Sequence, residues 1–138
     1  MPKPNLKPIA WGIVGMVFLL SCADRAATAT SAEPAPEWPE APLEVLEAEV
    51  VGDELHLLVS YGGGCAEHFL EVESAGPLLK SMPPKQPLRL VHRTPGDPCR
   101  ALIQRELFFD LKPWRGTPHG VTVILLENWN EPLPYEYD

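Results

Sequence analysis

Basic residues are scarce in this chain of 138 residues, which carries 11 Lys and Arg against 19 Asp and Glu and a formal net charge of −8. Nucleic-acid binding depends on Lys and Arg side chains that contact phosphates, so we expect no nucleic-acid partner. The same balance argues against electrostatic attachment to the headgroups of anionic lipids. Any contact with a membrane must therefore rely on apolar groups.

Motifs of established reactions are also missing. The chain has no C-x-x-C pair and no G-x-S-x-G elbow, and the glycines at 62–64 are not followed by the Lys-Ser/Thr of a phosphate-binding loop. Three adjacent glycines more simply indicate positive φ angles or a close backbone approach. We therefore expect no enzyme and no cofactor.

Long apolar runs are absent except for Ile9–Leu20, about a dozen residues that follow a basic start with Lys3 and Lys7. This length fits the h-region of a secretory signal peptide better than a membrane-spanning helix. The run ends in Leu19-Leu20-Ser21-Cys22, which resembles the lipobox of bacterial lipoproteins. The alternative is an ordinary signal peptide with a chance cysteine.

The lipobox resemblance implies cleavage after a signal peptide at residues 1–21 and lipidation of Cys22. Acyl chains on Cys22 would anchor the protein to a membrane outside the cytoplasm. The resemblance also implies sorting to the outer membrane if the source is Gram-negative, because Ala23 and not Asp follows the cysteine. We therefore expect a protein of the bacterial cell envelope.

Two regions follow the predicted signal peptide. Residues 22–42 are rich in Ala and Pro and nearly free of branched apolar side chains, which predicts a disordered linker. Residues 43–138 show period-two alternation broken by Pro and Gly turns, which predicts an all-β domain. The expected fold is a small β-sandwich, with an immunoglobulin-like arrangement as one form and a small open barrel as the alternative.

Cysteine pairing is constrained by the lipidation of Cys22. The remaining two cysteines, Cys65 and Cys99, form an even pair in an oxidising compartment, which predicts a disulfide between them. His68 lies three residues after Cys65, and His92 lies seven residues before Cys99. The strand pattern places both histidines on apolar faces, beside Leu70 and Leu90.

Three interpretations of these residues compete. We favour two buried histidines that hydrogen-bond to the backbone or to Asp97. The alternative is a metal site for Zn²⁺ or Cu²⁺, built on His68 and His92 with Glu67 or Asp97, or on the two histidines and two thiolates. A reactive cysteine is the third interpretation, although no feature of the sequence predicts a lowered thiol pKa.

A second resemblance covers most of residues 43–138. The order Gly62-Gly63-Gly64-Cys65-x-x-His68, His92, Asp97-x-Cys99 and Phe109-Asp110-Leu111 is similar to that of small uncharacterised bacterial lipoproteins. It implies a secreted, lipid-anchored β-domain and brings no known activity. We therefore expect a binding or structural domain whose partner is an envelope protein or a glycan, and a metal-binding lipoprotein is the alternative.

Overall fold

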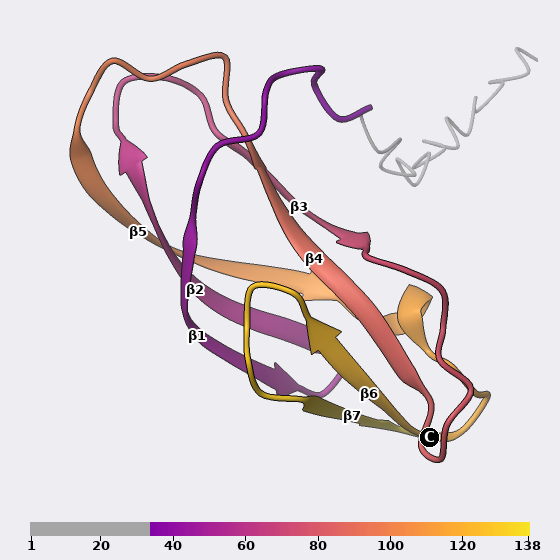
Figure 1. Ribbon diagram of the computed structural model, residues 1–138. Helices are drawn as coiled ribbons and strands as arrows, with labels where there is room; N and C mark the ends of the chain where they lie inside the picture. The colour runs from indigo at the N-terminus through magenta and orange to yellow at the C-terminus, as the bar shows by residue number, and fades with distance from the viewer. Residues whose placement is uncertain (1–33) are drawn as a thin grey trace, which may run out of the picture. The chain divides into compact units, whose positions relative to one another are not determined.

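Two β-sheets pack face to face in the computed structural model of this protein, which describes residues 34–138 (Figure 1). The three-stranded sheet has the order β1-β2-β5, and the four-stranded sheet has the order β3-β4-β6-β7. The strands are β1 (Glu44–Val51), β2 (Glu54–Gly63), β3 (Phe69–Ser74), β4 (Lys85–Arg93), β5 (Ala101–Asp110), β6 (Gly120–Leu126) and β7 (Leu133–Tyr137). The prediction of an all-β sandwich is confirmed.

Alternation along the strands produces the core between the two sheets. In β2, Leu55, Leu57 and Val59 are buried, whereas the side chains between them lie on the outer face. Strands β4, β6 and β7 contribute the opposing layer, in which Leu88 and Ile124 are fully buried. Each such aliphatic side chain stabilises the fold by about 1.5–3 kcal/mol relative to exposure.

The four-stranded sheet contains a parallel pair. β4 pairs with β6 in parallel over Lys85–Leu88, whereas its partner β3 and the β6–β7 pair are antiparallel. The two sheets of the immunoglobulin fold are antiparallel, so this sandwich departs from the immunoglobulin-like form that we considered. Strand β7 comes from the proline-interrupted tail and lies at the sheet edge, where Pro134 is tolerated.

The folded unit begins before the predicted boundary at residue 43. Glu40 forms an isolated antiparallel bridge with Arg93, and the Ala41 N–H donates to the His92 carbonyl at 2.8 Å. Ala41 and Pro42 were assigned to a disordered linker from their composition. Ala41 instead pairs with the part of β4 that lies beyond its contact with β6, and the Pro42 carbonyl contacts the His92 side chain.

The predicted signal peptide, Cys22 and the beginning of the predicted linker lie outside the described residues. Within residues 34–138, no helix is long and apolar enough to cross a membrane.

Candidate functional site

The predicted histidines meet at one end of the sandwich, where three segments converge. His68 lies in the loop between β2 and β3, His92 is near the end of β4, and Asp97 lies in the loop between β4 and β5. The Cys65–Cys99 disulfide joins these two loops, with 5.7 Å between the Cα atoms, so its prediction is confirmed.

A continuous hydrogen-bond chain connects the two imidazoles. His68 Nδ1 lies 2.8 Å from His92 Nε2, and His68 Nε2 lies 2.9 Å from Asp97 Oδ2. At the other end, His92 Nδ1 lies 3.2 Å from the Pro42 carbonyl oxygen. The favoured interpretation, buried histidines bonded to the backbone and to Asp97, agrees with this geometry.

The histidines and Asp97 are buried, so their hydrogen bonds replace contacts with water. The side chains of His68 and Asp97 are only 6% and 4% exposed, and His92 is 2% exposed. The Tyr61 ring packs against both imidazoles, with ring centroids 4.8 Å and 4.7 Å away. Polar groups so poorly hydrated must find partners within the protein.

Asp97 is the centre of the hydrogen-bond network. Its Oδ2 accepts from the backbone N–H groups of Gly64, Cys65 and Ala66 at 2.8–3.0 Å, and its Oδ1 accepts from the Cys99 N–H at 2.9 Å. These donors, the Ala66 N–H first among them, hold the pKa of the Asp97 carboxyl well below its ordinary value of 3.8, against the effect of burial. The carboxylate therefore joins the same two loops as the disulfide.

Gly63 supplies the space for this network. It has a φ of +152°, and a Cβ atom at this position would lie 2.5 Å from Asp97 Oδ2 and 2.7 Å from His68 Nε2. A Cβ atom on the neighbouring Gly62 would meet nothing within 4 Å. The close backbone approach predicted for the glycine run is therefore made at Gly63, which is next to the His68–Asp97 pair.

The partners of the two imidazoles indicate which ring nitrogens act as donors. The Pro42 carbonyl and the Asp97 carboxylate only accept, so His92 Nδ1 and His68 Nε2 must each carry a proton. Burial lowers the pKa of His92, which favours the neutral form of that ring.

This network makes folding sensitive to acid. The folded-state pKa of Asp97 is lower than its unfolded value, so its contribution to stability is present above about pH 3.8 and is lost as the pH falls below it. The pKa of His92 is also lowered, mainly by burial, so its contribution is present above about pH 6.5 and is lost as the pH falls toward the folded value.

Metal binding by His68 and His92 conflicts with these contacts, since all four ring nitrogens already have partners. The candidate third ligand Glu67 is exposed. Among the described residues, the one group of three or more potential ligands whose atoms all lie within 4.8 Å of one another is Cys65, Asp97 and Cys99, and the two sulfur atoms are joined in the disulfide. They therefore offer no thiolate.

We accordingly predict no thermal shift when Zn²⁺ or Cu²⁺ is added at micromolar concentration to untagged protein. A metal at 100 times its dissociation constant would add about 2.7 kcal/mol, which differential scanning fluorimetry detects as a shift of several degrees. His68→Gln and His92→Gln serve as matched controls. A shift of that size in the wild type that both variants lose would instead establish a metal site.

A second polar cluster closes the opposite end of the sandwich. Asp53, in the turn between β1 and β2, accepts from the Tyr135 hydroxyl at 2.6 Å and from Arg115 at 2.7 Å. These two donors lower the pKa of the Asp53 carboxyl. The arrangement joins the β1–β2 turn to β7 and has a structural explanation.

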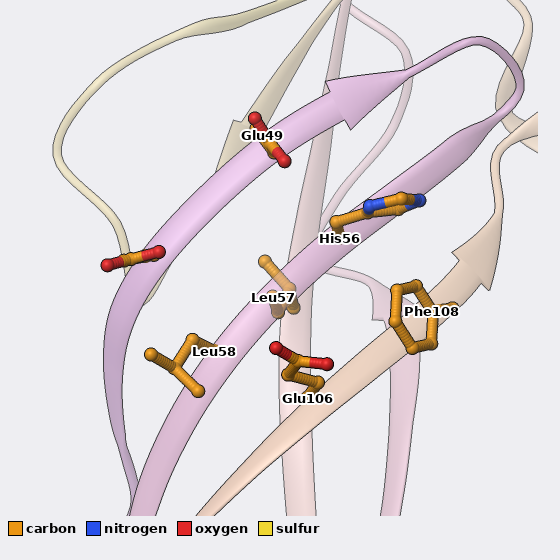
Figure 2. A pocket seen from close by; sticks show the side chains of 7 residues that line it. Glu49, His56, Leu57, Leu58, Glu106 and Phe108 are labelled. Carbon is orange, nitrogen blue, oxygen red and sulfur yellow. The ribbon is translucent and has the colours of Figure 1, made fainter.

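The outer face of the three-stranded sheet carries a shallow pocket of about 220 Å³ (Figure 2). Figure 2 shows Glu49 from β1, His56 and Leu58 from β2, and Glu106 and Phe108 from β5 around it. The edge of the His56 ring meets the Phe108 ring, with centroids 4.7 Å apart. The sequence pattern did not predict this pocket.

No family model matches this chain, no curated protein matches it, and no solved structure matches it. The function must therefore be argued from the residues themselves.

Proposed function

We propose that this protein is a lipid-anchored, extracytoplasmic lipoprotein of the bacterial cell envelope whose folded part is a binding or structural β-domain. The observation that carries the proposal is the sequence Leu19-Leu20-Ser21-Cys22 after a basic start and a short apolar run. A thioether on Cys22 and acylation of its amine supply an anchor that the acidic domain lacks. The expected location is the outer membrane if the source is Gram-negative.

The Cys65–Cys99 disulfide supports a location outside the cytoplasm. Structural disulfides persist in oxidising compartments and are rare where thiols are kept reduced. The disulfide closes a loop with a sequence separation of 34 residues and joins two loops that also share Asp97. A disulfide of this kind stabilises a small domain whose hydrophobic core is limited, as is common in proteins outside the cytoplasm.

A binding or structural role fits the candidate site better than metal binding or catalysis. The imidazoles of His68 and His92 have their nitrogens engaged by Asp97, by each other and by the Pro42 carbonyl. A general base needs a nitrogen that can reach the proton of a substrate or nucleophile. These contacts argue that the site holds loops together.

The test of the anchor is Cys22→Ser. Serine has no thiol for the thioether, so the variant should lose the mass of the lipid and should leave the detergent phase in a partition assay. The double variant Cys65→Ser/Cys99→Ser is the matched control, because it replaces the other two cysteines and should keep the anchor. Equal mass and equal partitioning of Cys22→Ser and the wild type would refute the proposal.

A further inference from the structure

One side of the sandwich is open between two strand edges. In the described part of the chain, β5 pairs only with β2 and β3 pairs only with β4, so the outer edge of each strand has no neighbour (Figure 1). A groove of about 400 Å³ lies between these edges. Its apolar walls include Phe69 and Leu70 beside β5 residues Leu107 and Phe109.

The backbone of β5 is available for hydrogen bonding along this edge. The Leu111 N–H donates to the Asp53 carbonyl, so the antiparallel register directs the backbone groups of alternate residues toward β2. The backbone groups of Leu102, Gln104, Glu106 and Phe108 therefore face away from β2. Proteins commonly protect such edges with Pro or Lys, and this strand of ten residues has neither.

The outer face beside this edge combines acidic and apolar side chains. Glu106 lies on β5, and Glu47 and Glu49 line the neighbouring pocket with it (Figure 2). Leu102 is 76% exposed and Phe108 is 58% exposed. Strands β1 and β2 contain no Lys or Arg, and Arg105 of β5 alternates onto the groove side.

We propose that β5 receives an extended segment of a partner protein in which apolar and basic side chains alternate. The segment adds a fourth strand to the sheet by hydrogen-bonding to the free backbone groups of β5. Its apolar side chains enter the groove beside Leu107 and Phe109, and its Lys or Arg side chains lie on the outer face beside Glu106. This inference rests on the proposed binding role and names its site and the chemistry of its partner.

Charge argues against a second copy of the chain as the occupant. Pairing of two β5 edges would join two acidic outer faces into one sheet, and each copy carries a net charge of −8. Like charges on neighbouring strands destabilise their pairing. A basic segment meets the same face with opposite charge, which also speeds association.

The probe is a ten-residue peptide of alternating valine and lysine, added to the full-length lipoprotein in detergent micelles. We expect saturable binding by fluorescence polarisation and shifts of the β5 backbone amides in NMR spectra. Alternating valine and glutamate should not bind. N-methylation of one of the two alternating sets of residues should abolish binding, whereas methylation of the other set should not, because only one set faces β5.

Two variants address the edge and the charge separately. Gln104→Pro removes a free N–H from an edge strand, where proline is tolerated, and should weaken binding about tenfold or more. Glu106→Lys leaves the backbone intact and should also weaken binding by about tenfold, since it replaces an ion pair by repulsion. Glu136→Lys, exposed on β7 of the other sheet, is the matched control and should change binding less than twofold.

Absence of saturable binding, or binding that Gln104→Pro and Glu106→Lys leave unchanged, would overturn the proposal. Equal binding by both N-methylated peptides would also overturn it, because it would leave only charge attraction. Light scattering detects the competing occupant: a dimer lost in Gln104→Pro would assign the edge to a second copy. Peptide binding does not depend on Cys22, so these results are separate from the test of lipidation.

Discussion

Replacing both cysteines of the Cys65–Cys99 disulfide with serine will lower the free energy of unfolding by about 2–5 kcal/mol. The closed loop has a sequence separation of 34 residues, for which the chain-entropy model gives roughly 4 kcal/mol. For a domain of about 100 residues this corresponds to a drop in Tm of about 10 °C or more. Denaturant titration and scanning calorimetry of the full-length protein measure both quantities.

Treatment with a reductant separates the effect of losing the disulfide bond from the effect of replacing the two cysteine side chains. It should destabilise the wild type as much as the double substitution does and should have no effect on the Cys65→Ser/Cys99→Ser variant. The loss should also be coupled to Asp97, because the backbone N–H groups of Cys65 and Cys99 donate to its two carboxylate oxygens. A wild type that keeps its stability in reductant would show that Asp97 alone holds the two loops.

Local sequence patterns were sufficient to predict the class of fold. Period-two alternation in residues 43–138 predicted strands, and the Pro and Gly turns separated them. In β2, the buried half of this alternation is Leu55, Leu57 and Val59. The same patterns did not predict which strands pair. The parallel contact between β4 and β6 is set by packing between distant segments, and alternation along one strand does not specify its neighbour.

The candidate site was only partly readable from the sequence. The strand pattern placed His68 and His92 at the edge of the core, and Asp97 was named as a hydrogen-bond partner. The contact with the Pro42 carbonyl was missed because Pro42 belongs to a proline-rich segment whose composition is typical of linkers. That composition could not show that Ala41 pairs with β4 and brings Pro42 to His92.

The glycine run shows the same limit at a single position. Its composition predicted a close approach or positive φ somewhere in 62–64. The sequence did not distinguish Gly62, where a Cβ atom would lie in open space, from Gly63, where it would lie 2.5 Å from Asp97 Oδ2. The difference arises from the loop that carries Asp97, more than 30 residues further along the chain. The two glycines therefore form a matched pair for testing the network.

Gly63→Ala should lower the free energy of unfolding by about 2–5 kcal/mol, because it adds backbone strain and forces the His68–Asp97 pair apart. Gly62→Ala should change this free energy by no more than about 1 kcal/mol in either direction. Denaturant titration at neutral pH measures both variants. Equal effects of the two substitutions would show that Gly63 does not support the buried pair.

The pH dependence of the same variants tests the mechanism. The wild type and Gly62→Ala should lose stability as the pH falls below about 3.8. In this range Asp97 becomes protonated in the unfolded chain but stays ionised in the folded protein. Gly63→Ala separates the carboxylate from its donors, so its loss of stability over this range should be smaller. Equal losses of stability in Gly63→Ala and Gly62→Ala over this range would contradict this mechanism, because the low pKa of Asp97 would then not depend on the space at Gly63.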